Sequence, residues 1–409
     1  MPPELPVRKP ATAAAAVPVS PAAVPPTAPD SAAAVPTAPV PRLVSLDALR
    51  GFDMFWIAGG ATIFRAFTKG SENEWVKRFQ EQLQHVEWEG FRFYDLIFPL
   101  FLFMIGVAIP YSLGKRLVRG DSKLRIYAHL LLRVAILIFF GMMINGNLLS
   151  FNPKDFQISY SVLQMLALGY LVASILYLHL NLPLQVLATA GLLAGYWALQ
   201  TFMPVPEHGP GIYEPGKLFS DWLNEQILGD WQGKWRGGWI LGIMTHGSTA
   251  MLGALAGQLL RSARGSTLKF LGLVLLGIVC LVGAWYWSPY FPVIKRRWTS
   301  TYVLWAGGWS FLLLAGFYLV IDVWKLRRWA FPFVVIGANS IFVYMSWSLC
   351  SGAYRAVAER FLGGLKPYFN SWYEGYYASC YEGIVWTGAF LVMWILLCYM
   401  YRNKTFIRV

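Results

Sequence analysis

The sequence contains little charge. Asp, Glu, Lys and Arg together make up only 13% of the 409 residues, whereas hydrophobic residues make up 56%. A chain with so few charged side chains cannot keep a large surface in water, so the composition argues against a soluble globular protein and indicates a polytopic membrane protein. The net charge of +13 comes from basic residues in short segments between apolar runs, and it implies no nucleic-acid partner.

Cysteine and the common soluble-enzyme motifs are scarce or missing. The four cysteines have neither CxxC nor metal-ligand spacing, so the sequence predicts no zinc site and no disulfide framework. Cys350 and Cys380 fall at ends of neighbouring expected spans and permit a disulfide, although two free thiols are the more usual state. A Walker loop, a GxSxG elbow, an HExxH motif and a GxGxxG with an acidic partner are all missing. We therefore expect no metal site.

Two regions differ sharply in composition. Residues 1–41 are mostly Ala, Pro, Val, Thr and Ser without a periodic apolar face, which predicts a disordered tail left in the cytoplasm. Residues 42–409 are predicted to form one all-α transmembrane bundle of about ten helices, since an apolar run of roughly 20 residues spans a bilayer. The expected spans are 43–67, 93–113, 124–149, 159–180, 182–202, 239–260, 268–287, 299–321, 330–350 and 381–401.

The basic residues predict the orientation of these spans. Lys and Arg concentrate in four connections, which would all share one side of a ten-span bundle: 115–125, 261–269, 325–328 and 402–408. By the positive-inside rule that side is cytoplasmic, and both termini lie there. The other side then carries the long segments 68–92, 145–157, 203–238 and 351–380. Residues 295–297 are basic but fall on this outer side, which indicates either a function or a basic cluster at the membrane interface.

One stretch places reactive groups at the mouth of a membrane helix. His85 lies in a short polar segment with Glu87 and Glu89, directly before an apolar run that contains Asp95 in its first turn. An imidazole with an ordinary pKa of about 6.5 can take a proton or form an acyl adduct at neutral pH, whereas many loop histidines are merely solvated. Asp95 can orient the imidazole or cap its own helix.

Further polar residues lie in or at the ends of apolar helices. Asp47 and Arg50, three residues apart on one helix face, are expected to pair, either to fix the first span or to act at a cytoplasmic mouth. Arg133, Asn145 and Asn339 are expected to meet other polar groups inside the bundle. The intramembrane His246 either has a function or hydrogen-bonds a neighbouring helix.

Six stretches, taken in order, resemble the heparan-alpha-glucosaminide N-acetyltransferase family and its bacterial relatives. They are RLVSLDALRG (42–51), HVEWEGFRFYDLIFPLFLFMIGVAI (85–109), LLRVAILIFFGMMINGN (131–147), VLQMLALGY (162–170), PVIKRRWTSTYVLW (292–305) and GANSIFVY (337–344). The resemblance implies a transmembrane enzyme that takes an acetyl group from cytoplasmic acetyl-CoA and delivers it to an amino sugar on the far side. The family's active-site histidine, in an H-x-x-W-x-G segment, falls on His85.

The resemblance and the polar residues together give the expected site. Asp95, Lys295, Trp298 and Asn339 fall on recurrent family positions, and Trp88 belongs to the histidine segment. The expected roles are catalysis by His85 and Asp95, substrate binding by Trp88, Lys295 and Trp298, and binding of the cosubstrate acetyl-CoA by Arg50, Arg133, Asn145 and Asn339. The expected partners are membrane lipid and a saccharide acceptor in the bacterial inner membrane, with a homodimer kept open as the assembly.

The sequence departs from the family pattern at two positions. Gly59 and Gly60 stand where the pattern has an asparagine at the outer end of the first span, and Met165 replaces an arginine. We also expect a chain without the large luminal domain of the lysosomal enzyme. Two alternatives therefore stay open: a membrane O-acyltransferase of cell-surface glycans, and a transporter of a sugar or lipid precursor. Against a transporter, the sequence indicates no internal repeat and no matched pair of broken helices.

Overall fold

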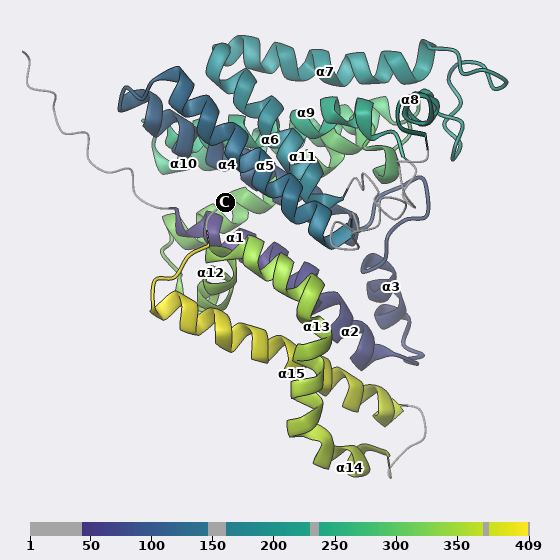
Figure 1. The fold of residues 1–409 in the computed structure, drawn as a ribbon, viewed down its shortest axis with the longest axis vertical. Coiled ribbons are helices and arrows are strands. Elements are labelled where there is room, and N and C mark those ends of the chain that lie inside the picture. The colour runs from purple at the N-terminus through teal and green to yellow at the C-terminus, as the bar shows by residue number, and fades with distance from the viewer. Residues whose placement is uncertain (1–42, 146–160, 230–236, 371–375, 408–409) are drawn as a thin grey trace, which may run out of the picture. The chain divides into compact units, whose positions relative to one another are not determined.

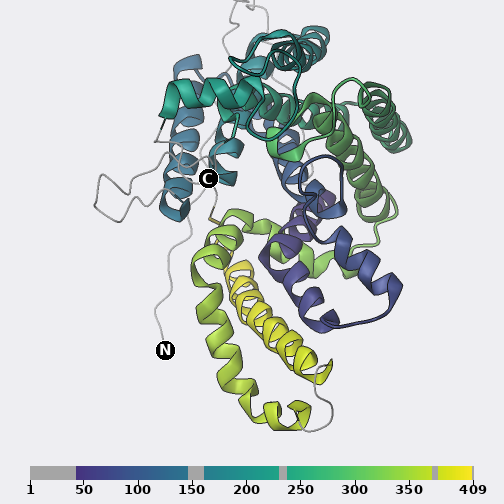
Figure 2. The ribbon, with the colours of Figure 1, turned by 90° about the vertical axis from the view of Figure 1, so that its right-hand side faces the viewer.

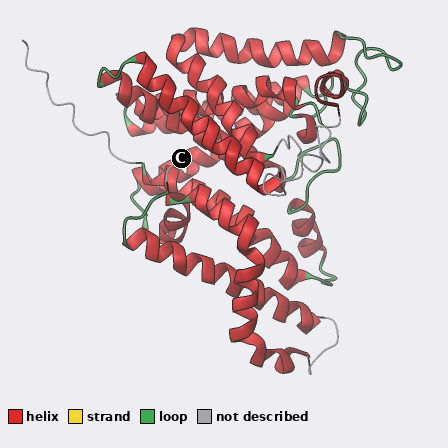
Figure 3. Cartoon of the chain, in the orientation of Figure 1, coloured by secondary structure: helices red, strands yellow, loops and turns green. Residues whose placement is uncertain are grey.

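The computed structural model describes residues 43–145, 161–229, 237–370 and 376–407. The tail predicted over residues 1–41 lies outside these ranges, as does nearly all of the predicted outer segment 145–157. Within the described residues all regular structure is helical, and the only β features are two isolated bridges (Figure 3). Residues 42–409 form one compact unit. The predicted all-α polytopic bundle is confirmed, and the four cysteines are free thiols.

Eight helices in the described residues are long and apolar enough to cross a membrane. They are α4 (Phe93–Val118), α5 (Lys123–Asn145), α6 (Val162–His179), α7 (Leu182–Phe202), α9 (Trp239–Arg261), α10 (Ser266–Trp287), α11 (Ser300–Phe317) with the π-turn that follows it, and most of α15 (Tyr376–Arg402). A ninth span results if α12 (Phe331–Ala338) and α13 (Ser340–Leu362) cross together, with a bend of 70° between them. Eight or nine such spans among the described residues are consistent with the expected bundle of about ten helices.

The first expected span is broken rather than continuous. α1 (Val44–Phe55) and α2 (Ala61–Thr68) are separated by a π-helical segment, Trp56–Gly60, in which Ala58 and Gly59 leave helical backbone angles. Gly59 has φ 134°, which a residue with a Cβ adopts only under strain. The bundle thus contains two broken helices, this one and the α12–α13 pair. The sequence indicated no matched pair of broken helices in an internal repeat, and the hydropathy of the two segments indicated neither of these breaks.

The two broken helices pack backbone to backbone. A Cβ added at Gly51 of α1 would overlap the carbonyl of Phe333 in α12, and one added at Gly337 of α12 would overlap the carbonyl of Asp47. Small residues allow such close contact between membrane helices. Substitution of either glycine would therefore push α1 and α12 apart.

The helix α4 lies at the centre of the bundle, where it contacts α9, α6, α11 and α1. Its closest neighbour is α9, because Gly106 of α4 faces the carbonyl of Ala250 and Gly253 of α9 faces the carbonyl of Phe103. By contrast, α7 and α10 bury only a minority of their residues, as expected for helices that face lipid (Figure 1). The rigid central helix carries the candidate site at its N-terminal end.

Two other parts complete the fold. α13 and α15 form a long helical hairpin (Figure 2) and also contact α12 and α2 respectively. The segments between the long helices contain the short helices α3 (Glu74–Gln82), which Asn73 caps, and α8 (Phe219–Leu228), while α14 (Lys366–Asn370) follows the end of α13. The segments around residues 85, 213–221 and 293–298 come together beside the N-terminus of α4 through hydrogen bonds.

Candidate active site

His85, Asp95 and Lys295 meet at the N-terminal end of α4. The Nδ1 atom of His85 lies 2.8 Å from Asp95 Oδ1 and 2.8 Å from Lys295 Nζ, and Lys295 Nζ lies 3.1 Å from the same carboxylate oxygen. Asp95 is fully buried, whereas 54% of the His85 side chain is exposed. The structure thus brings together three of the residues expected in the site, one of them 200 residues away along the chain.

The local fold fixes the Asp95 carboxylate. Asp95 is the third residue of α4, and its Oδ2 accepts the backbone N–H groups of Arg92 at 3.2 Å and Val86 at 3.3 Å. The phenol of Tyr302 in α11 donates to the Asp95 carbonyl at 2.7 Å. One oxygen therefore caps the helix and the other faces the imidazole and the ammonium. The two roles that the sequence left open for Asp95 are both present in the geometry.

The contacts of His85 Nδ1 restrict where its proton can sit. If Nδ1 carries the proton it donates to Asp95, and Nε2 then has a free lone pair. If Lys295 instead donates to Nδ1, the proton lies on Nε2. Burial lowers the pKa of Lys295, and the neighbouring Asp95 carboxylate partly opposes this shift. A lysine of this kind gives up its proton more readily than one at the surface.

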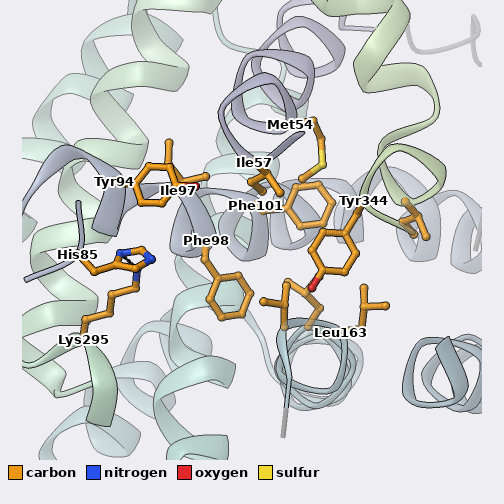
Figure 4. Close-up of a pocket in the computed structure, with 13 residues that line it drawn as sticks. Met54, Ile57, His85, Tyr94, Ile97, Phe98, Phe101, Leu163, Lys295 and Tyr344 are labelled. Atoms are coloured by element: carbon orange, nitrogen blue, oxygen red, sulfur yellow. Dashed lines mark hydrogen bonds between the residues drawn. The ribbon is translucent and has the colours of Figure 1, made fainter. Parts of the chain in front are cut away.

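A cavity of about 240 Å³ opens beside His85 and Lys295 (Figure 4). In Figure 4 these two side chains lie on one side of the cavity, while Tyr344 of α13 and Leu163 of α6 lie on the other. Most of the remaining lining is apolar: Met54, Ile57, Ile97, Phe98, Phe101, Val162, Leu166 and Ile341, with Tyr94 as a polar member. The cavity thus lies between α1, α4, α6 and α13. Both broken helices contribute to it, which agrees with the rule that irregular backbone at membrane depth lines a cavity or is buried in protein.

Two of the residues expected to bind the cosubstrate lie just beyond this cavity. Arg50 Nη2 donates to the carbonyl of Met104, three residues past the cavity residue Phe101 on α4, and its Nη1 lies 3.9 Å from Asp47. The guanidinium of Arg133 lies 4.4 Å from the ring centre of Tyr170, one turn past Leu166 on α6. Along α4 and α6, His85 thus lies beside one end of the apolar cavity, and the two guanidinium groups lie beyond the cavity residues Phe101 and Leu166.

The other expected site residues do not line the cavity. Trp88 donates to the carbonyl of Tyr213 at 2.7 Å, and buried Trp298 donates to Thr249 at 3.0 Å and packs on His246. His246 itself hydrogen-bonds the Gly242 carbonyl of its own helix.

The two expected asparagines also lie away from the cavity. Asn145 is exposed at the end of α5. Asn339 lies at the α12–α13 bend, where its amide accepts from Ile407 N at 2.9 Å and donates to the Thr405 carbonyl at 3.2 Å. These bonds tie the bend to the segment after α15, so the Asn339 side chain has a structural use.

The sequence analysis missed three residues near the cavity. Tyr94 and Tyr344 line it, and the Tyr94 ring lies 4.9 Å from the imidazole of His85. Asp53 in α1 is fully buried, and neither of its carboxylate oxygens has a hydrogen-bond partner among the described residues. It lies one helical turn before the cavity residue Ile57, on the same face of α1. In the sequence, the spacing of four residues between Asp53 and Ile57 was the feature that could have placed the two side chains on one side of the first span.

Asp53 gives a stability prediction. A buried carboxyl without partners costs free energy, and leucine has nearly the same shape without the polar atoms. We expect Asp53→Leu to stabilise the protein by about 1–3 kcal/mol, seen as a higher thermal unfolding midpoint in detergent. Asp53→Asn keeps the shape and the polarity and is the matched control, with no gain expected. A lower midpoint for Asp53→Leu than for Asp53→Asn would show that the carboxyl group makes a stabilising contact.

The fold and the cluster define a polytopic helical membrane protein with a His–Asp–Lys site at the mouth of an apolar cavity. Residues 42–218 match the family model described as heparan-alpha-glucosaminide N-acetyltransferase, catalytic. The chain is 26% identical over 424 residues to the Homo sapiens heparan-alpha-glucosaminide N-acetyltransferase and 24% identical over 427 residues to the Mus musculus protein of the same name. Each alignment covers 90% of this chain, which spans 60% and 61% of the relatives' lengths. The resemblance predicted from the motif order is confirmed, since residues 42–218 match this family model and both acetyltransferases align with 90% of the chain.

Proposed function

We propose that this protein is an acetyl-CoA-dependent acyltransferase that moves an acetyl group from the cytoplasmic side of the bacterial inner membrane to an amino sugar or glycan on the opposite side. The observation that carries the proposal is the contact of His85 with buried Asp95 at an apolar cavity. His85 is half-exposed, so an external acceptor can reach it. The names of the relatives support the acyl transfer and an amino-sugar acceptor.

His85 would act as the general base. With its Nδ1 proton donated to Asp95, the free Nε2 lone pair can take a proton from the acceptor amine. The amine nitrogen attacks the thioester carbonyl carbon, the new C–N bond forms and the C–S bond breaks. The imidazolium then returns its proton to the departing thiolate. Throughout, the Asp95 carboxylate compensates the positive charge on the imidazole ring.

The cavity and the two guanidinium groups would hold the cosubstrate. The cavity lining is largely apolar. The polar side chains of the lining lie on opposite sides of the cavity: His85 and Lys295 on one side and Tyr344 on the other (Figure 4). Beyond it, Arg50 and Arg133 supply positive charge suited to phosphate groups. The proposal gives no direct contact with the cosubstrate or acceptor to the other expected site residues, which do not line the cavity: Trp88, Trp298, Asn145 and Asn339.

Purified protein incubated with labelled acetyl-CoA and a panel of amino sugars tests the proposal directly. We expect an acetylated sugar that survives mild base, because an amide is stable where an ester is hydrolysed. A label lost in mild base would instead identify an O-acyltransferase. No product with any acceptor, from protein that remains folded, would contradict both enzyme functions.

One observation favours a transporter as a second candidate. Broken helices beside a midplane cavity are typical of transporters, and both α1–α2 and α12–α13 are broken next to the cavity residues Ile57 and Ile341. Reconstituted protein that accumulates a labelled sugar in vesicles without acetyl-CoA would support this function. The breaks are equally useful to an acyltransferase that must pass part of its donor through the membrane, so uptake is the deciding measurement.

A further inference from the structure

A second ion pair lies close to the His85 site, in parts of the chain that the family model does not match. Arg297 and Asp221 are joined by contacts of 2.6 Å (Nε to Oδ1) and 3.1 Å (Nη2 to Oδ2). Their side chains are only 9% and 10% exposed. The Nη2–Oδ2 contact is a hydrogen bond, whereas the Nε–Oδ1 contact is a close approach of opposite charges. Together the two contacts hold the guanidinium beside the carboxylate.

Arg297 and Lys295 belong to the same short turn. The 3₁₀ segment Lys295–Arg297 ends at Trp298, which has the left-handed backbone angle φ 51°. In this turn Lys295 points to Asp95 and His85, whereas Arg297 points to Asp221. A turn of three residues has little freedom once both of its ends are held. The position of the Lys295 ammonium therefore depends on where Arg297 is fixed.

Further contacts surround this ion pair and connect it to the His85 segment. The Trp88 ring lies 5.2 Å from the Arg297 guanidinium, and the phenol of Tyr196 donates to the Arg297 carbonyl at 2.6 Å. Gly90 N donates to the Val293 carbonyl at 2.9 Å, joining the segment after His85 to the residues before Lys295. Asp221 also accepts the backbone N–H of Gly216 at 3.2 Å. The Asp221 carboxylate, in the first turn of α8, thus bonds both the loop before α8 and the Lys295 turn, while Trp88 bonds the same loop from the His85 segment.

We propose that Asp221 is a positioning residue of the His85 site, which through Arg297 holds Lys295 against Asp95 and His85. The proposal rests on the function proposed above for His85. It assigns to the segment 213–221 a part in the reaction, although none of its residues lines the cavity. It also gives a reason for the basic residues 295–297, which are an exception to the positive-inside trend. Lys295 contacts Asp95 and His85, and Arg297 fixes the turn by pairing with Asp221.

The ion pair should respond to acid. Burial raises the pKa of Asp221, and Arg297 opposes this shift only in part. As the pH falls through this raised pKa, Asp221 takes a proton and the attraction to Arg297 is lost, at a higher pH than for an ordinary surface carboxylate. Tyr196 and Arg297 are the titratable or charged side chains that interact with it. The Lys295 turn is then released on acidification.

Asp221→Asn tests the proposal, with Asp322→Asn as the matched control. Asp322 is part-buried and accepts the backbone N–H of Ser45 elsewhere in the bundle, so its substitution reports the general effect of removing a carboxylate charge that accepts a backbone N–H. We expect Asp221→Asn to lower kcat/KM for acyl transfer by about 10–100-fold, as for other groups that orient a reactive side chain. Because asparagine has no titratable carboxyl group, the pH profile of the variant should also lose the part of its acid-side decline that protonation of Asp221 causes in the wild type. Asp221→Glu, which keeps the carboxylate, should restore part of the rate.

A readout independent of catalysis separates this proposal from the proposed function. The rate at which an amine-reactive ester labels Lys295, followed by mass spectrometry, should rise in Asp221→Asn, while labelling of exposed Lys77 stays constant. If labelling and the pH profile are both unchanged, Asp221 does not position Lys295. If labelling rises but the wild type transfers no acyl group, the positioning stands and the proposed function fails. Should Asp221→Asn not fold, unchanged Lys295 labelling in Asp221→Glu and Arg297→Lys would overturn the proposal.

Discussion

Replacement of His85 by asparagine is expected to lower kcat for acyl transfer by about 10²–10⁴-fold, the usual contribution of a positioned general base. Asparagine keeps a side chain that can hydrogen-bond Asp95, but it has no group that takes a proton at neutral pH. Because 54% of the His85 side chain is exposed, the fold should tolerate the change. Labelled acetyl-CoA and an amino sugar give the rate, and the thermal unfolding midpoint verifies folding.

His208→Asn is the matched control, since His208 is an exposed histidine in another outer segment. It should leave the rate unchanged. A folded His85→Asn variant that transfers acetyl at the wild-type rate would refute the catalytic role of His85. If the wild type alone becomes labelled on the protein after quenching, His85 carries the acyl group as an intermediate rather than acting only as a base. This second result would leave the expected loss of kcat unchanged.

The helical bundle could be predicted from apolar run length, because hydropathy acts locally along the chain. α4, α6, α7, α9 and α10 begin and end within a few residues of the expected limits. The breaks could not be predicted in this way. The break at Gly59 depends on a positive φ, and the bend at Asn339 depends on side-chain bonds to residues 405–407. Neither changes the hydropathy of its segment.

The candidate site could be predicted only where its residues are close in sequence or where motif order supplied them. His85 and Asp95 are ten residues apart across a helix start, a spacing that places both at one helix end. Lys295 was predicted from the family resemblance and because the basic residues 295–297 are an exception to the positive-inside rule. Nothing in the neighbouring sequence indicated its contact with Asp95. The Asp221–Arg297 pair joins two loops far apart in the chain, and neither residue stands out in its own segment. Long-range pairing of this kind is decided by tertiary packing.

The second large effect is expected at Asp95, where asparagine should destabilise the protein. Asp95 is fully buried and Lys295 is 18% exposed, so loss of the carboxylate leaves a largely buried ammonium without its counter-charge. Removal of one partner of a buried ion pair typically costs about 3–5 kcal/mol. Unfolding of Asp95→Asn by SDS in mixed micelles should show a loss of that size. The acyl-transfer rate should fall as well, because an amide cannot compensate the imidazolium charge.

The double variant Asp95→Asn with Lys295→Met separates stability from catalysis. With both charges removed, the uncompensated ammonium is gone, so the double variant should be more stable than Asp95→Asn alone by about 1–3 kcal/mol. Its rate should stay low, since His85 still lacks the carboxylate that accepts its Nδ1 proton. Recovery of the rate together with stability would mean that Asp95 only caps α4 and holds Lys295. Recovery of stability alone would mean that the oxygen facing His85 serves the reaction, while the oxygen that accepts from Arg92 and Val86 serves the helix.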